Sequence, residues 1–584
     1  MKPASCYRKC LSVFLAFMIA FSSLFTFSVT PVAAESGSGN PIQTTIYVSP
    51  EGDDSNDGTI DAPFKTIAKA KEKVRTLPKT GGDIVVQIAD GFYSLDEPLV
   101  FDASDSGSES CTIRYEAAPG AKPVISGGKM LEKGVWTEAT ELTQTKGLKA
   151  YKTTLHRNEK LRAIYVNNKR ANMTTSETIT SANRTTNGTP TVSFTGTDNP
   201  WAWQNGSNIA GAIVFSANVG LSPDTKNPQN IEAESVGGST ARWARPFVCF
   251  ASAEPAPDAS NMPGGTMLRF QMPYAAISQS LSNNTQYNPN NNQIIRNAFE
   301  FLNKCGDFYF DQAESTLYYI PLEGEDINTA DVVIPELETL IDIRGIPVGD
   351  RLNPIDGSDN GRVRYITFDG LTFSHTDYKL YELTGTFKYS DRETAETATS
   401  RGFASVQGCI VNKVYFPAYI NWHETFYRGY DIPPAAIMIN AARNIKVLNG
   451  EISFTGFNGI HIENDVRDIE VTGNYIRETL SSGVVVGHPT HIYENDEPII
   501  HESSNAGIRS WAGVDKEKYK AGTEAVPQDI YITNNFLYRN CYGFPGANSL
   551  TSFYTTNMQV LHNYIYDSTY GAMSIGWGWC EYDG

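Results

Sequence analysis

The stretch RDIEVTGNYIRETLSSGVVVGHP, residues 467–489, carries the pattern that decides the fold. Apolar residues alternate at Ile469 and Val471, and Gly473 and Asn474 interrupt the alternation. A period of two indicates a β-strand, and Gly and Asn at the breaks indicate turns. The stretch therefore predicts short strands joined by tight turns.

Further copies of this stretch recur through the last third of the chain. They are RYITFDGLTFSHT (364–376), RNIKVLNGEISFT (443–455), QDIYITNNFLYRN (528–540) and TNMQVLHNYIYDS (556–568). Aligned copies place Ile445, Ile469, Ile530 and Met558 in one apolar column. Repeats of 20-odd residues with shared apolar columns predict coils that stack and bury one core. We expect an all-β fold, a right-handed parallel β-helix; a β-sandwich with accidental internal similarity is the alternative.

A polar column accompanies the apolar ones. Gly450, Asn474, Asn535 and Asn563 occupy the same position in successive copies. Asn tolerates the left-handed turn conformation that Gly favours, and stacked amides can hydrogen-bond along the axis. We therefore expect the three Asn side chains to stack at one turn.

The N-terminus has the features of a secretory signal. Lys2, Arg8 and Lys9 precede the apolar run LSVFLAFMIAFSSLF (11–25), and Val-Ala-Ala at 32–34 fits a cleavage site. This pattern predicts a signal peptide over about residues 1–34 and a secreted, extracellular protein. A single membrane anchor is the alternative.

The rest of the chain divides into three regions. Residues 35–130 resemble the cap and first coils of a β-helix, with an amphipathic helix from Thr66 to about Val74. The coil rhythm disappears over 131–345, where we expect an inserted, largely antiparallel β region. Coils occupy 346–584. No closing cap is visible before Gly584, as expected for a fragment of a longer protein.

Charge narrows the classes of partner. The formal net charge is −18, which disfavours nucleic acid and anionic membranes. A strongly anionic polysaccharide is also disfavoured, unless a metal or a local basic patch compensates.

Several phrases resemble a known family. They are IRNAFEFLNKCGDFYFDQAESTLYYIPLEGEDINTADVVIPELETLIDIRG (295–345), YITFDGLTFSHT (365–376) and NYIYDSTYGAMSIGWGW (563–579). With the N-terminal cap, they are similar to bacterial β-helix proteins of glycoside hydrolase family 141. The resemblance implies a β-helix with an inserted β region. It also implies α-L-fucosidase or xylanase activity on plant cell-wall glycans.

The repeat alignment exposes one further column just outside the strands, here called the charged column because its last three members are charged. It runs through His375, Phe454, Glu478, Arg539 and Asp567. Equivalent positions on successive coils lie about 4.8 Å apart, so Glu478 and Asp567 would be about 9–10 Å apart. Inverting glycosidases separate their carboxylates by about 6.5–9.5 Å. Glu478 and Asp567 are thus candidate catalytic residues, and a solvated polar column is the alternative.

A second candidate cluster lies in GIHIENDVRD (459–468). Glu463 and Asp465 are its candidate catalytic carboxylates, and His461 and His488 are candidate sugar-binding residues. A charged turn is the alternative interpretation.

Aromatic rings supply the apolar floor on which sugars stack. Candidate substrate-binding residues are, besides Arg539, Trp577, Trp579, Trp422, His423 and Trp511. The first two alternate with Gly on a turn, and the others lie in loops beside the predicted groove.

No metal ligand set or cofactor is predicted. The loop of Asp53, Asp54, Asn56 and Asp57 resembles part of a Ca²⁺ loop but lacks its full spacing. A solvated turn is the favoured interpretation, with Ca²⁺ as the alternative.

These features predict a secreted glycoside hydrolase acting on a xylan- or fucose-containing polysaccharide or oligosaccharide, with no nucleic acid or membrane partner. Two carboxylates would carry out the acid/base chemistry. One alternative is a polysaccharide lyase in which Arg539 abstracts a proton from a uronate. A non-catalytic glycan-binding surface protein is the other.

Overall fold

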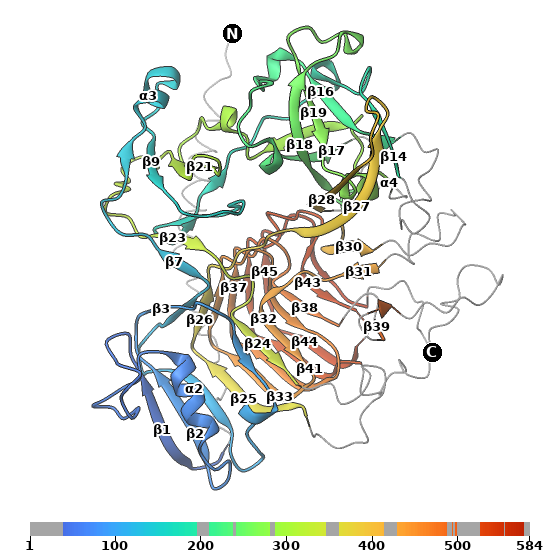
Figure 1. Ribbon diagram of the computed structural model, residues 1–584. Coiled ribbons are helices and arrows are strands. Elements are labelled where there is room, and N and C mark those ends of the chain that lie inside the picture. The colour runs from blue at the N-terminus through green and yellow to red at the C-terminus, as the bar shows by residue number, and fades with distance from the viewer. Residues whose placement is uncertain are drawn as a thin grey trace, which may run out of the picture.

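The computed structural model describes most of the chain after residue 38. The described residues are 39–194, 209–237, 241–280, 286–345, 361–403, 405–413, 429–487, 493–494, 497–498, 526–553 and 555–576. They fold into an all-β protein with large parallel sheets, as the sequence predicts. Figure 1 shows these sheets below a second, separate group of strands.

Three parallel sheets run the length of the lower part of the molecule. The first contains, in spatial order, β1 (Ile42–Val48), β2 (Asp83–Ile88), β5 (Ile113–Ala117), β25 (Val363–Asp369), β33 (Ala442–Leu448), β36 (Val466–Thr472), β41 (Gln528–Thr533) and β44 (Thr556–Leu561). The second contains β3 (Phe92–Ser94), β6 (Val124–Ser126), β26 (Thr372–Ser374), β34 (Glu451–Ser453), β37 (Tyr475–Arg477), β42 (Phe536–Tyr538) and β45 (Tyr564–Tyr566). The third contains β4 (Leu99–Phe101), β24 (Ile341–Arg344), β32 (Ala435–Asn440), β35 (Asn458–Ile462), β38 (Val484–Val486), β43 (Asn548–Ser552) and β46 (Gly571–Ser574).

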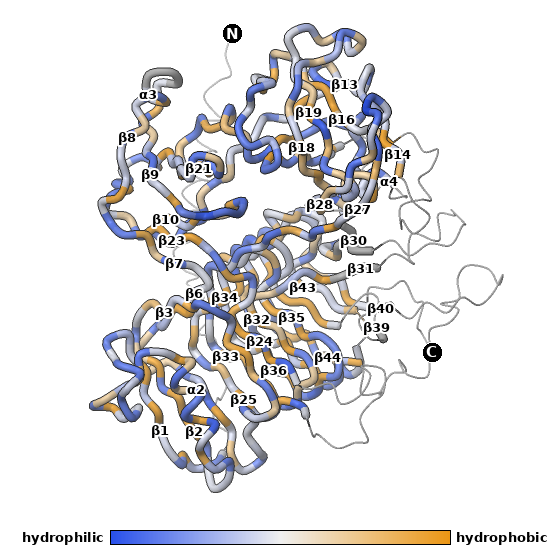
Figure 2. Tube along the Cα trace, in the orientation of Figure 1, coloured by the Kyte–Doolittle hydropathy of each residue, from blue (hydrophilic) through white to orange (hydrophobic). Residues whose placement is uncertain are grey.

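Each repeat contributes one strand to each of these sheets in turn. We call such a set of three strands a coil; β36, β37 and β38, from the opening stretch, form one. Neighbouring coils are in register, so that Ile445 pairs with Ile469, Ile469 with Ile530, and Ile530 with Met558. This is the apolar column of the sequence alignment, and its first three members are buried in the core that the sheets share. Figure 2 shows the alternation of apolar and polar residues along these strands.

The Asn column is confirmed. The backbone N–H of Asn474 donates to Oδ1 of Asn535 at 2.9 Å, and that of Asn535 donates to Oδ1 of Asn563 at 3.0 Å. The side-chain amides of Asn474 and Asn535 also donate to the next amide oxygen and to a backbone carbonyl of the previous coil. Each Asn thereby satisfies buried backbone groups at a turn where the sheet ladders end.

The N-terminal helix α2 (Ile67–Arg75) covers the first coils. Thr66 caps it by accepting a hydrogen bond from the backbone N–H of Lys69, and Ile67, Ala70 and Val74 bury its apolar face. Two more α-helices, α3 (Thr140–Lys146) and α4 (Tyr274–Ser280), lie among the upper strands. Among the described residues, every helix is too short or too polar to cross a bilayer.

The upper strands form three mainly antiparallel sheets. One contains β11 (Lys169–Arg170), β10 (Tyr165–Val166), β23 (Val332–Pro335) and β7 (Gly128–Met130). Another contains β12 (Asn172–Met173), β21 (Asp307–Asp311), β22 (Thr316–Tyr319), β9 (Tyr151–Thr154) and β8 (Thr137–Glu138). The largest contains β13 (Arg184–Thr185), β16 (Ala212–Phe215), β19 (Thr266–Phe270), β18 (Phe247–Pro255), β28 (Glu396–Phe403), β27 (Tyr381–Tyr389), β14 (Thr191–Phe194), β15 (Ile209–Ala210), β17 (Glu232–Val236) and β20 (Asn292–Arg296).

The chain passes between the two parts more often than a single insertion requires. The hairpin β27–β28 follows residue 345 in sequence, yet it pairs with β14 and β18 of the largest antiparallel sheet. Strand β24, before residue 346, belongs to the third parallel sheet. Two small antiparallel sheets account for the remaining described strands. One contains β29 (Ser405–Val406), β30 (Cys409–Lys413) and β31 (Gly429–Asp431), and the other contains β39 (Tyr493–Glu494) and β40 (Glu497–Pro498).

Candidate functional site

The turns that follow the last five strands of the second parallel sheet build the charged column. His375, Phe454, Glu478, Arg539 and Asp567 all have positive φ, between 52° and 60°. That left-handed conformation is unfavourable for residues with a Cβ and is often retained at functional sites. It turns the chain sharply after the strand, so these side chains occupy one edge of the sheet.

Three of these residues are linked through a tyrosine. Nε of Arg539 lies 2.8 Å from Oε1 of Glu478. The Arg539 guanidinium also lies over the ring of Tyr542, 5.1 Å from its centroid, and the Tyr542 hydroxyl donates to Oδ1 of Asp567 at 2.8 Å. The structure thus brings together Glu478, Arg539 and Asp567, which the alignment had placed on successive coils.

A hairpin from the upper part reaches this edge. Strands β10 and β11 are joined by Asn167 and Asn168, with φ of 49° and 58° as in a type I′ turn. The hydroxyl of Tyr165 donates to the carbonyl of Phe454 at 2.7 Å. Arg170 donates to the Tyr165 hydroxyl at 3.0 Å and to the backbone carbonyl of Glu478. These bonds attach the hairpin to the charged column.

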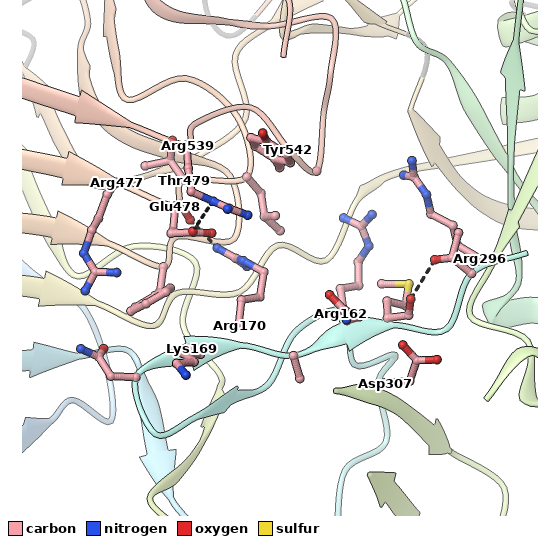
Figure 3. A pocket seen from close by; sticks show the side chains of 18 of the residues that line it. Arg162, Lys169, Arg170, Arg296, Asp307, Arg477, Glu478, Thr479, Arg539 and Tyr542 are labelled. Carbon is pink, nitrogen blue, oxygen red and sulfur yellow. Dashed lines mark hydrogen bonds and ion pairs between the residues drawn. The ribbon is translucent and has the colours of Figure 1, made fainter. Parts of the chain in front are cut away.

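A cavity of about 720 Å³ lies between the hairpin and the column. Figure 3 shows Glu478 in it between Arg539 and Arg170. This volume is typical of a site for a small molecule or a sugar residue. The residues that line it are Arg162, Asn168, Lys169, Arg170, Ala171, Asn172, Met173, Thr175, Arg296, Lys304, Asp307, Phe454, Arg477, Glu478, Thr479, Leu480, Arg539, Tyr542 and Gly543.

The lining is strongly basic. Seven of its side chains are Lys or Arg, and only Glu478 and Asp307 are acidic. Four of the cations pair with carboxylates outside the cavity: Arg162 with Glu232, Arg296 with Glu234, Lys304 with Glu177, and Arg477 with Glu451. Arg539 pairs with Glu478. For Lys169 and Arg170, the described part of the chain provides no carboxylate partner.

Asp307 is the second carboxyl group of the cavity. It is 4% exposed, and its Oδ2 accepts a hydrogen bond from the backbone N–H of Lys304 at 3.0 Å. Burial raises the pKa of Asp307 above its usual value, although the backbone hydrogen bonds oppose this. A carboxyl group with a raised pKa is suited to protonate a leaving oxygen.

The second predicted cluster lies elsewhere, at the turn from the third sheet to the first. Asp465 is held by Arg362, with Nε–Oδ1 at 3.0 Å, and by Arg443, with Nη2–Oδ1 at 2.9 Å. Glu463 accepts a hydrogen bond from Asn440. Nε2 of buried His461 lies 3.0 Å from the carbonyl of Gly487. These residues are not part of the cavity lining, and the two arginines give Asp465 a structural role at this turn.

The remaining predicted residues lie outside the part that the structure describes. They are Trp422, His423, His488, Trp511, Trp577 and Trp579. The predicted aromatic groove therefore stays a prediction.

The carboxylates of the acidic loop near the N-terminus accept hydrogen bonds from nearby groups of the protein. Asp54 accepts hydrogen bonds from the backbone N–H groups of Lys65 and Thr66, while Asp53 bonds Ser55 and Asp57 bonds Thr59. No group of three or more His, Cys, Asp or Glu side chains in the described residues is placed to hold a metal ion. Among the described cysteines, Cys111, Cys249, Cys305 and Cys541 have free thiols.

Sequence reasoning did not identify Lys169, Arg170, Asp307 and Tyr542 as members of the site. The signal available for the first two was YVNNKR (165–170), in which Asn-Asn between short strands is typical of a tight hairpin turn. Nothing in that segment shows that the hairpin meets coils almost 300 positions later in the chain. No sequence pattern around Asp307 or Tyr542 indicates that these residues line the cavity.

Comparisons with known proteins concern mainly the fold. A solved chain titled "Glycoside hydrolase" matches with a TM-score of 0.63 over 92% of this chain and 80% of that one, at 20% identity. At that identity, the match is evidence of a common fold alone. A structure titled "The complex structure of XylC with xylose" matches with a TM-score of 0.39 and 12% identity, over 91% of this chain and 60% of that one.

Sequence comparisons match only a short part of the chain. No protein-family model matches the chain. The uncharacterised protein YwoF of Bacillus subtilis (strain 168) is 37% identical over 95 residues. The matched segment is 16% of this chain and 17% of YwoF, so it covers a small part of each protein.

Proposed function

We propose that this protein is a secreted glycoside hydrolase that cleaves a xylan- or fucose-containing plant cell-wall glycan in the cavity beside Glu478. Its scaffold is a right-handed parallel β-helix, which the stacked coils support. The observation that carries the proposal is the carboxylate of Glu478, oriented by Arg539 inside a cavity sized for a sugar residue. The fold likeness to a glycoside hydrolase is consistent with it.

The chemistry requires a second carboxyl group. Asp567 lies two coils from Glu478 and is linked to the site by Tyr542, whereas Asp307 lines the cavity directly. Two coil spacings amount to about 9–10 Å, at the upper edge of the roughly 6.5–9.5 Å that admits a water molecule in inverting enzymes. In this mechanism one carboxyl group protonates the glycosidic oxygen and Glu478 activates water.

The test is turnover on a panel of plant polysaccharides, followed as new reducing ends. Glu478→Gln should lower the rate by at least about 10²-fold, the usual contribution of acid/base catalysis. If Asp567 is the second catalytic group, Asp567→Asn should lower the rate by a similar factor. If Asp307 is that group, Asp307→Asn should do so instead. Glu470→Gln is the matched control, because Glu470 is ion-paired with Lys446 on the first sheet and is not in the cavity lining. A folded Glu478→Gln variant with normal turnover would refute the assignment.

The basic lining favours one further candidate, a polysaccharide lyase acting on a uronate. Its base would have to be a neutral group, and Arg539 is poorly suited to this. Burial lowers the pKa of Arg539, but Glu478 together with Tyr538 and Tyr542 outweighs that effect and raises it above the usual value. A guanidinium so stabilised does not give up its proton readily. In the same assay a lyase would form unsaturated uronate, detected by its absorbance, and a hydrolase would not.

A further inference from the structure

The cavity has a charge opposite to that of the chain. The whole protein has a formal net charge of −18, yet cations outnumber carboxylates by seven to two in the cavity lining. A concave surface lined by one sign of charge focuses its field on the ligand that enters it. Such a local excess is the condition under which an acidic protein can bind an anionic glycan.

Ion pairing shows where that charge is still available. Five of the seven cations have a carboxylate partner, so their charge is largely neutralised. Lys169 and Arg170 have none among the described residues. Both are on β11, where Figure 3 shows Arg170 beside Glu478 and Lys169 farther from it on the same hairpin.

Arg170 is also held rigidly. Its guanidinium donates to the hydroxyl of Tyr165, to the carbonyl of Thr455 at 3.4 Å and to the carbonyl of Glu478, and lies 5.1 Å from the Tyr165 ring centroid. These acceptors carry no net charge, so they orient Arg170 without neutralising it. A guanidinium has five N–H donors, and part of this set is left for a ligand. A fixed cation binds an anion without first losing side-chain entropy.

We infer that the cavity binds a negatively charged sugar residue, with Lys169 and Arg170 holding its carboxylate or sulfate group. The inference rests on the proposed function for the identity of the ligand as a glycan. In this arrangement the coils contribute the reacting carboxylate, and the hairpin β10–β11 of the upper part selects the charge of the substrate. A neutral sugar would leave both cations without a counterion.

Binding can be measured separately from cleavage. The probes are trigalacturonate with its methyl ester, and a sulfated galactose disaccharide with its desulfated form, titrated calorimetrically into the intact protein. We expect at least one charged probe to bind about 10-fold or more tightly than its neutral partner, the effect of one charge-assisted hydrogen bond. The pair that shows the difference identifies carboxylate or sulfate as the recognised group.

Variants assign the preference to residues. Lys169→Gln and Arg170→Gln should each reduce the charged-to-neutral ratio, and Lys122→Gln, which removes an exposed charge far along the chain from the cavity lining, should not. Lys169 is exposed, so its variant keeps the test valid if Arg170→Gln fails to fold. Equal affinity for charged and neutral probes, or a preference unchanged in the folded variants, would overturn the inference. Hydrolysis of a neutral glycan without charge preference would overturn it and leave the proposed function intact. A preference for charged probes without hydrolysis of any glycan would support the inference and contradict the proposed function.

Discussion

The five residues of the charged column share a backbone conformation but differ in surroundings. His375 and Phe454 are buried under the hairpin, whereas Asp567 is exposed. Nδ1 of His375 lies 3.1 Å from the Ser126 hydroxyl, and its ring is stacked parallel to that of Phe454. The same turn therefore supplies a core residue in one coil and an exposed charged side chain in another.

His375 makes stability depend on pH. Burial, with Arg170 and Arg477 nearby, lowers the pKa of His375 from 6.5 to about 3. The unfolded chain therefore takes up a proton at this residue below pH 6.5, while the folded protein stays neutral there until about pH 3. The free energy of unfolding should fall over that window by an amount on the order of a few kcal/mol.

The measurement is urea unfolding at several pH values, comparing wild type with His375→Gln. The variant should lose part of the pH dependence between pH 6.5 and 3, whatever its stability at neutral pH. His562→Gln is the control, because His562 is exposed. Parallel pH profiles for wild type and His375→Gln would contradict the prediction.

At the scale of the element, the Asn column shows how much of the fold was predictable. The alignment placed Gly450, Asn474, Asn535 and Asn563 at one position, and the structure stacks the three amides there. The structure also explains why the first member of the column is Gly450. Oδ1 of Asn474 accepts a hydrogen bond from the N–H of Gly450, where a Cβ would lie 2.3 Å from the carbonyl oxygen of Leu371. The repeat pattern predicted the coils because each strand contacts its own counterpart in the next copy.

Asn535 is the central member of this column. Its amide donates to the carbonyl of Val471 and to Asn563, and its oxygen accepts hydrogen bonds from Asn474. Asn535→Ala would leave these buried groups without partners, at about 1–3 kcal/mol for each unsatisfied group. We expect a loss of about 2–4 kcal/mol in the free energy of unfolding, measured by urea titration. Gln559→Ala, at an exposed position of β44, should cost less than about 0.5 kcal/mol. A loss that small at Asn535 would mean that water replaces the amide.

The hairpin β10–β11 shows the limit of such prediction. A turn of two Asn residues is readable from sequence, but the partners of the hairpin are Phe454, Thr455 and Glu478 on distant coils. No periodicity links these positions. The carboxylate and Arg539 of the site were therefore predicted from the repeat, whereas the cations opposite them emerged only from tertiary structure.

At the scale of the whole molecule, a buried cluster of charges in the upper part lies beside the coils. Glu232 on β17 is fully buried and accepts hydrogen bonds from Arg162, at 3.0 and 3.1 Å, and from Lys160. The Arg162 guanidinium lies over Phe247 of the upper sheet and Phe544 of the coils, 5.4 and 5.3 Å from the ring centroids. Arg162 also lines the cavity, so this cluster helps to position the site.

Glu232→Gln should therefore lower the free energy of unfolding. Burial alone would raise the pKa of Glu232, but Arg162 and Lys160 outweigh it and lower the pKa from 4.5 to about 2. Because the folded value is depressed, the carboxylate contributes its full stability above about pH 4.5, and the contribution is lost as pH falls toward 2.

Removing one partner of a buried pair costs about 3–5 kcal/mol. Urea unfolding should show that difference from wild type at pH 7 and a smaller one at each step below pH 4.5. Glu177→Gln, which breaks the exposed pair with Lys304, should leave the free energy of unfolding almost unchanged. If the two variants were equally stable at pH 7, the buried pairs of Glu232 would not be a major source of stability.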